Sequence, residues 1–333
     1  MVKRVIGLDI GGANIKAAHS EGATIERPLA LWKNPKRLPD ALADVARRLP
    51  ASELLAVTMT GELCDCFPTQ RAGVNAILDA VETGFGSLPM RVWQSEGRFV
   101  DTAAARTTPQ LTGAANWLAL AEFAGRFFAG QSGLVIDVGS TTPDIIPVCQ
   151  GRPVPRGRTD KQRLLNRELV YTGARRTPLC ALLGAEGAAE FFATMHDVHI
   201  ILGNTPEDDL DCDTADGRPA TRPFALARLA RMVCADREKC TDAELHSLAE
   251  KLFRRQCGLL QEGCRQVAAG LREPGRLLLI AGSGEFLARA AIAAEPDLAN
   301  RPLISLGEKF GPNISRAACA YAVMMLAREE ANG

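Results

Sequence analysis

The chain has 333 residues, and its 39 Lys and Arg residues balance its 39 Asp and Glu residues to a formal net charge of zero. This balance lacks the basic excess of proteins that bind nucleic acids or anionic membranes, so we expect neither as a partner. With 47% hydrophobic and 23% charged residues, the composition is typical of a folded globular protein of about two domains.

No segment of the sequence predicts a membrane span or a secretory signal. The longest apolar run, 317–327, is far shorter than the roughly 20 residues that cross a bilayer. Lys3 and Arg4 precede only a short apolar stretch, which Asp9 interrupts, and a signal peptide needs a longer apolar region. We therefore expect a cytoplasmic protein whose ten cysteines are mostly reduced and buried.

The first half of the chain predicts a β-meander followed by alternating helices and strands. The expected strands are Val5–Ile10, Asn14–His19, 28–32, 54–60 and Met90–Gln94, with a Gly11-Gly12 turn after the first. The expected helices are 38–49, 69–83 and 114–128.

The same order of elements restarts near residue 134. The expected strands are 134–138, 142–148, 169–172, 276–281 and 303–306, and the expected helices are 184–195, 225–235, 242–271, 285–294 and 312–328. This repetition predicts an α/β chain with a duplicated fold, in which two similar domains face a central cleft.

We assign residues 1–130, together with a C-terminal helix at about 312–333, to the first domain and 131–311 to the second. The apolar C-terminal helix is either buried within the monomer or shared with a second copy in a homodimer. The segment 204–221 carries six Asp and Glu residues among Pro and Gly, which indicates a loop. It is either a solvated insertion or a loop that holds a magnesium diphosphate or caps a substrate.

Each predicted half opens with an aspartate at the end of an apolar strand, followed by a turn of small residues. Asp9 precedes Gly11-Gly12-Ala13-Asn14, and Asp137 precedes Gly139-Ser140-Thr141-Thr142. Small residues let backbone N–H groups converge on an anion, while the carboxylate can hold a hydrated Mg²⁺. Two such turns facing each other predict a cleft that grips a phosphate chain from both sides.

A third element, Gly282-Ser283-Gly284, lies between an apolar strand and a helix start, where a phosphate group suits the helix N-terminus. Lys16 adds positive charge near the first turn, or else points outward from its strand. The residues expected to contact phosphate are Gly11, Gly12, Ala13, Asn14, Lys16, Gly139, Ser140, Thr141, Thr142, Gly282, Ser283 and Gly284.

The paired turns and the later Gly-x-Gly resemble the phosphate-1, phosphate-2 and adenosine motifs of the acetate kinase, sugar kinase, Hsp70 and actin superfamily. Within it, the chain resembles the hydantoinase/oxoprolinase-like branch, and more specifically the proteins of tetrahydromethanopterin-linked one-carbon transfer and methanofuran biosynthesis. Four further segments carry the closer resemblance: 58–65, 115–119, 171–178 and 214–217. The resemblance implies a duplicated ribonuclease H-like (actin-like ATPase) fold.

The closer resemblance implies a transferase that joins an aminomethylfuran diphosphate to the phenol oxygen of γ-glutamyltyramine and releases diphosphate. Under that reading, Asp9 and Asp137 hold Mg²⁺ through waters, and Glu62 and Asp65 accept the phenol proton, since a phenol with a pKa near 10 needs a base at neutral pH. A cap on the next helix is the alternative role of Glu62 and Asp65.

Three further residues are candidates for contact with substrate. Asn116 is expected to line the cleft, and Arg175 and Arg176 to bind carboxylates or diphosphate. Surface ion pairing is the alternative for the two arginines.

Two other functions remain open from the sequence. One is an ATP-dependent enzyme of the same fold, either a small-molecule kinase or an oxoprolinase/hydantoinase-type hydrolase that binds ATP and ADP. The other is a non-catalytic, nucleotide-gated partner protein.

Overall fold

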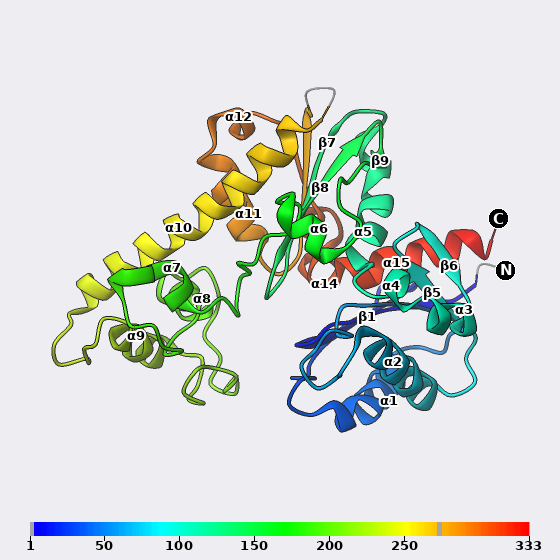
Figure 1. The fold of residues 1–333 in the computed structure, drawn as a ribbon, viewed down its shortest axis with the longest axis horizontal. Helices are drawn as coiled ribbons and strands as arrows, with labels where there is room; N and C mark the ends of the chain where they lie inside the picture. Colours follow the sequence, from blue (N-terminus) through cyan, green and yellow to red (C-terminus); the bar gives the residue numbers. More distant parts are fainter. Residues whose placement is uncertain (1–2, 272–274, 333) are drawn as a thin grey trace.

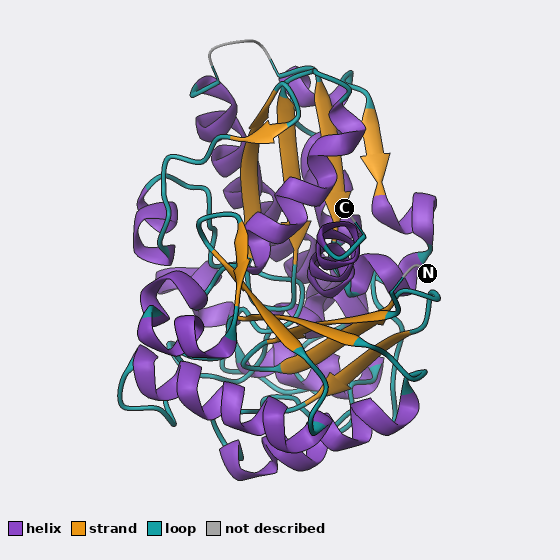
Figure 2. Ribbon diagram, turned by 90° about the vertical axis from the view of Figure 1, so that its right-hand side faces the viewer, coloured by secondary structure: helices purple, strands orange, loops and turns teal. Residues whose placement is uncertain are grey.

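The computed structural model describes residues 3–271 and 275–332. It contains a six-stranded and a five-stranded sheet, each with helices around it (Figures 1 and 2). The strands of the first sheet are β1 (Val5–Ile10), β2 (Asn14–His19), β3 (Thr24–Pro28), β4 (Leu54–Met59), β5 (Met90–Gln94) and β6 (Arg98–Val100). Those of the second sheet are β7 (Gly133–Val138), β8 (Pro143–Cys149), β9 (Arg152–Pro153), β10 (Leu277–Ala281) and β11 (Leu303–Ser305).

The helices divide between the two halves of the chain. Helices that follow strands of the first sheet are η1 (Pro35–Arg37), α1 (Leu38–Arg48), α2 (Gln70–Phe85), α3 (Thr102–Thr107), α4 (Pro109–Thr112), α5 (Asn116–Ala124) and η2 (Gly125–Phe128). The remaining helices are α6 (Asp160–Leu165), α7 (Leu179–Leu183), η3 (Gly184–Glu186), α8 (Met195–Ile201), α9 (Arg222–Arg231), α10 (Asp242–Ala269), α11 (Glu285–Ala293), α12 (Pro296–Ala299), α13 (Leu306–Phe310), α14 (Pro312–Arg316) and α15 (Ala318–Glu330).

Strand order confirms the predicted duplication. The first sheet runs β3-β2-β1-β4-β5-β6 and the second β11-β10-β7-β8-β9. In the first sheet, β1 pairs antiparallel with β2 and parallel with β4. In the second sheet, β7 pairs antiparallel with β8 and parallel with β10. The same hairpin therefore occupies the same place in each half, with Asp9 paired to Lys16 in one and Asp137 to Asp144 in the other.

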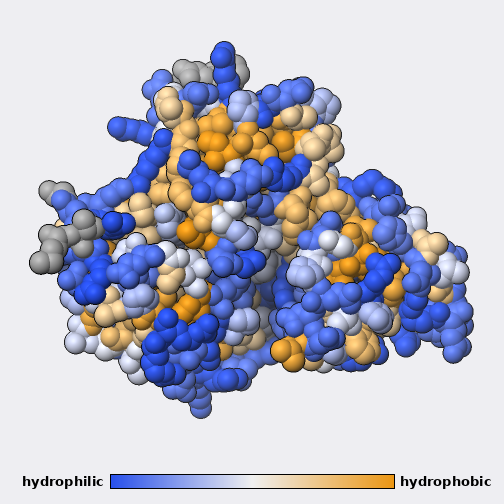
Figure 3. Space-filling view, turned by 180° about the vertical axis from the view of Figure 1, so that it is seen from behind, coloured by the Kyte–Doolittle hydropathy of each residue, from blue (hydrophilic) through white to orange (hydrophobic). Residues whose placement is uncertain are grey.

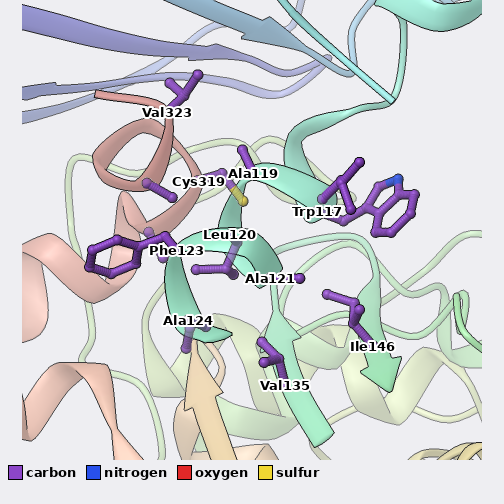
Figure 4. Packing of buried hydrophobic residues seen from close by; sticks show 14 of the residues in the cluster. Trp117, Ala119, Leu120, Ala121, Phe123, Ala124, Val135, Ile146, Cys319 and Val323 are labelled. Atoms are coloured by element: carbon purple, nitrogen blue, oxygen red, sulfur yellow. The ribbon is translucent and has the colours of Figure 1, made fainter. Parts of the chain in front are cut away.

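A shared core holds the two sheets together. Alternation on the central strands sends Leu8 toward α1 and α2, and Ile136 toward α10 and α11. The opposite faces of the two sheets pack against α5 and α15. Figure 2 shows the C-terminal helix α15 between the sheets. Figure 4 shows buried residues of this shared core, among them Trp117 from α5, Val135 from β7 and Val323 from α15.

Helix α15 packs against α5, β1 and β4. Gly7 makes this close approach possible, because a Cβ there would lie only 2.0 Å from the carbonyl oxygen of Ala320. The apolar C-terminal helix is thus buried within the monomer, which is the first of its two predicted placements.

A helical subdomain extends the second half. Helices α7, α8 and α9 enclose a separate apolar cluster and join the second sheet along the long helix α10 (Figure 1). The acidic segment 204–221 is a loop of this subdomain, as predicted, closed by a single bridge between Asp208 and Ala220.

Several predicted elements are wrong or misplaced. The strand predicted over 28–32 ends at Pro28, and Leu29 and Leu31 instead donate backbone hydrogen bonds to the turn after β1. The strand predicted over 169–172 is only a bridge from Leu169 to Asp144, and β9 takes its place. In the first case buried apolar residues support a turn instead of a strand, and in the second the backbone pairs only with the start of β8.

Two predicted helices also differ from the structure. Over 184–195 only a 3₁₀ turn forms before α8 begins at Met195, because Gly184 adopts a φ of 56° directly after α7. The helix predicted over 312–328 divides at Ala317 into α14 and α15. The helix predicted over 114–128 begins at Asn116 and continues as η2 after Ala124.

Candidate active site

The turns after β1 and β7 both line a cleft of about 370 Å³ between the two halves. From behind, the molecule shows a recess between its lobes (Figure 3). The predicted site residues that line the cleft are Asp9, Gly11, Gly12, Ala13, Asn14, Lys16, Glu62, Asp65, Asn116, Asp137, Gly139, Ser140, Thr141, Thr142 and Arg176.

The two turns have the same hydrogen-bond geometry. Gly11 N donates to Asn14 O and Gly139 N to Thr142 O, each at 2.9 Å. Within the described ranges, the next two N–H groups of each turn, at positions 12, 13, 140 and 141, donate to no protein acceptor. Unpartnered N–H groups on successive residues are donors of the kind that anion sites use, and each side of the cleft presents such a pair.

The carbonyl groups of the first turn are held by the chain around it. Leu31 N donates to Gly12 O and Leu29 N to Ala13 O, each at 2.9 Å. These bonds hold the peptide planes of the turn in place, and its N–H groups at 12 and 13 have no protein acceptor within the described ranges.

The second turn is held in the same way by the segment 171–178. Gly173 N donates to Thr141 O at 2.8 Å, and Arg175 N and Arg176 N both donate to Ser140 O. A Cβ on Gly173 would lie 2.4–2.5 Å from backbone atoms of Ser140 and Thr141, so this close packing requires glycine.

Buried carboxylates lie beneath the turns. Burial, opposed by Lys16 and an Asn116 hydrogen bond, raises the pKa of Asp9 to about 6. Burial, together with the neighbouring Asp144 carboxylate, raises the pKa of Asp137 to about 7. Asn116 Nδ2 donates to Asp9 Oδ2 at 3.4 Å, while Asp9 Oδ1 is buried without a hydrogen-bond partner.

This arrangement fits a cation. The raised pKa values mean that the ionised forms of these buried, neighbouring carboxylates are disfavoured. A bound cation would stabilise the ionised forms. Among residues 3–271 and 275–332, no three His, Cys, Asp or Glu side chains form a complete direct ligand set. Asp9 and Asp137 supply carboxylate oxygens, which are donors that Mg²⁺ accepts beside its own waters, so their chemistry is compatible with that ion.

Glu62 follows β4 and is almost fully buried at the cleft wall. Gln70 Nε2 donates to Glu62 Oε1 at 3.4 Å, and Oε2 has no partner. Burial raises the pKa of Glu62 to about 7, which suits proton transfer near neutral pH. The alternative role as a helix cap does not apply, because the Thr69 side chain caps α2.

Two other predicted groups lie outside the cleft lining. Gly282 N donates to Ser315 and Gly284 N to Val138 O at 2.9 Å, so these N–H groups are already used by protein acceptors. Arg175 forms ion pairs with Asp211, at 2.6 Å, and with Asp213 in the acidic loop. Arg175 therefore has the second of its two predicted roles, ion pairing, and does not line the cleft.

The structure adds cleft residues that the sequence patterns missed. Arg163, from α6, forms a buried ion pair with Asp144 at 2.8 Å and stacks 4.0 Å from the Trp117 ring centroid. Asp160 lies beside this pair, and its pKa is raised to about 6 by burial and by Asp144. Asp144 could have been found in the sequence, because it occupies the position in the second hairpin that Lys16 occupies in the first.

A duplicated sheet pair with a cleft between its opening hairpins defines the actin-like class of proteins. The solved structure of Ta0583, an archaeal actin homolog, matches with a TM-score of 0.50 at 13% identity, covering 99% of this chain and 100% of that one. The agreement confirms the predicted fold.

The family model for Hydantoinase/oxoprolinase matches residues 53–304, and the chain belongs to that family. It is also 34% identical over 337 residues to the (4-{4-[2-(gamma-L-glutamylamino)ethyl]phenoxymethyl}furan-2-yl)methanamine synthase of Methanocaldococcus jannaschii, covering 98% of each chain. The protein of the same name from Methanococcus vannielii is 31% identical over 209 residues, covering 60% of this chain and 92% of that one.

Proposed function

We propose that the protein is a transferase that condenses an aminomethylfuran diphosphate with a tyramine-type phenol and releases diphosphate. The name of the Methanocaldococcus jannaschii relative describes an ether that joins a furan methylene group to a phenol oxygen. The present chain covers nearly all of that relative, so the same ether-forming condensation is the activity that we assign to it.

One observation carries the proposal: two turns with unpartnered N–H groups face one cleft from opposite halves. A diphosphate has two phosphoryl groups, and each turn can accept one of them. Donors already placed where charge develops on a leaving group stabilise the transition state without reorganisation. A site of this shape can therefore stabilise a departing diphosphate. The same geometry would also bind the phosphates of a nucleotide.

Asp9 and Asp137 would hold Mg²⁺ through its waters. Bound there, the ion would neutralise charge on the departing diphosphate. Lys16, opposite Asp9 on the paired strand, places a further positive charge beside the first turn. The buried Asp144–Arg163 pair brings a guanidinium group to the opposite wall.

Glu62 is the base that we assign to the phenol proton. As the phenol oxygen forms its bond to the furan methylene carbon, the carbon–oxygen bond to diphosphate breaks and the phenol proton passes to Glu62. No oxidant or ATP is needed for this exchange. Asp65 lines the same wall and is the second candidate to receive the proton.

The test uses the purified protein with Mg²⁺, aminomethylfuran diphosphate and γ-glutamyltyramine. We expect ether and diphosphate in a 1:1 ratio by mass spectrometry and a coupled diphosphate assay, with added ATP unconsumed. The matched variant Asp137→Asn keeps the size of the side chain and removes its charge, and should lose most of the rate. ADP formation that depends on a substrate, without ether, would instead identify a kinase or an ATP-dependent hydrolase.

A further inference from the structure

The exposed part of the cleft lining includes large apolar and aromatic side chains as well as Asp65, in contrast to the buried carboxylates of the interior. Leu63 and Tyr171 line the cleft with 61% and 68% of their surface exposed, and Trp32 also lines it. Leu63 and Trp32 come from the first half of the chain and Tyr171 from the second. Exposed large apolar side chains in the lining of a cleft indicate contact with an apolar part of a ligand.

A cation–π stack spans the cleft lining from one half of the chain to the other. The guanidinium carbon of Arg176 lies 4.1 Å from the centroid of the Trp32 ring. Trp32 directly follows Leu31, which is hydrogen-bonded to the first turn, and Arg176 N is hydrogen-bonded to Ser140 O of the second turn. The stack is therefore anchored to the turns after β1 and β7.

Arg176 differs from its neighbour Arg175 in what its charged group contacts. Both terminal nitrogens of Arg175 are committed to Asp211, at 2.6 and 2.7 Å. Arg176, by contrast, forms no ion pair or side-chain hydrogen bond with any residue that the structure describes. The cation–π contact holds the guanidinium group over the Trp32 ring, and its N–H groups can bind a carboxylate bidentately.

We infer that Trp32, Leu63, Tyr171 and Arg176 form the site that binds the phenolic acceptor, an inference that rests on the proposed function. The aryl ring of the acceptor packs among the three apolar side chains, and a carboxylate on its tail pairs with Arg176. Glu62 directly precedes Leu63 and is buried, so it lies where the phenol end of the ring enters the charged interior. The site selects phenols whose tail carries a carboxylate.

Two acceptor substrates distinguish the contact made by the aryl ring from the contact made by the carboxylate. γ-Glutamyltyramine has both the ring and a carboxylate, whereas tyramine has the ring alone. We expect Arg176→Gln to raise the KM for γ-glutamyltyramine about tenfold, the loss of about one charge-assisted hydrogen bond, and to leave the KM for tyramine and for the diphosphate donor unchanged. Trp32→Ala should raise the KM for both acceptors and leave that for the donor unchanged.

Lys309→Gln is the matched control. It also removes a cation that lies over aromatic rings, at 5.2 Å from Phe127 and 5.8 Å from Phe310, but Lys309 does not line the cleft. This variant should change none of the three KM values. Thermal unfolding of each variant shows whether it is folded before kinetics are compared.

Equal increases in the KM for γ-glutamyltyramine and tyramine on Arg176→Gln, or an increase in the KM for the donor, would overturn the inference. If the wild-type protein forms no ether, the proposed function fails, and calorimetry then tests the binding site directly. Titration with γ-glutamyltyramine should still give tighter binding to wild type than to Arg176→Gln, and equal affinity would refute the acceptor site.

Discussion

Gly173 controls the geometry of the turn after β7, and Gly173→Ala perturbs that turn directly. The added Cβ would lie 2.4–2.5 Å from backbone atoms of Ser140 and Thr141, whereas real Cβ contacts stay above 3.0 Å. The turn must therefore move by roughly 0.5 Å, and overpacking of this kind costs about 1–3 kcal/mol. For a chain of 333 residues, that corresponds to a fall in Tm of about 1–4 °C.

The displaced turn should also bind diphosphate more weakly, because its N–H groups no longer converge. Thermal unfolding measures the first effect and calorimetric titration with Mg²⁺ and diphosphate the second. Gly258→Ala is the matched control, since a Cβ in that part of α10 meets no atom within 4 Å, and alanine in a helix interior should stabilise the protein by about 0.5–1 kcal/mol. Wild-type stability and diphosphate affinity in Gly173→Ala would refute this account of the turn.

Three further predictions concern charged groups. Because burial raises the pKa of Asp137 from 3.8 to about 7, the folded state holds this proton more tightly than the unfolded state, and metal-free wild type loses stability as the pH rises from about 4 through 7. Asp137→Asn has no carboxyl group to ionise there, so the Tm of this variant minus that of wild type should increase from pH 4 to 7. A difference in Tm that does not change with pH would show that Asp137 does not cause the loss. The pKa of Glu62, raised to about 7 by burial, predicts a wild-type kcat/KM that rises with pH to a plateau above 7. Glu62→Gln should lower kcat by about 100-fold or more and abolish that rise, and an unchanged profile would exclude Glu62 as the base. Arg175→Ala removes the ion pairs to Asp211 and Asp213, so limited proteolysis should cleave the loop 204–221 faster than in wild type, and equal cleavage rates would show that these pairs do not hold the loop.

Local patterns in the sequence determined much of the fold. Apolar runs that end in Asp9 and Asp137, each followed by a turn of small residues, identified the two opening hairpins, and their repetition along the chain identified the duplication. These signals are readable because the burial of a strand and the backbone freedom of a turn depend on residues close together in sequence. The same reasoning fails at 28–32, where buried apolar residues support a turn, and at 169–172, which forms only a bridge to β8.

The partners of individual side chains were decided only by the tertiary structure. Arg175 and Arg176 are adjacent and chemically identical, yet one pairs with an aspartate 36 residues later and the other stacks on Trp32 across the cleft. The Asp144–Arg163 pair likewise depends on where α6 docks. Sequence periodicity shows which face of an element is buried, but the contacts that give a charged group its role join distant segments, and only the folded chain brings them together.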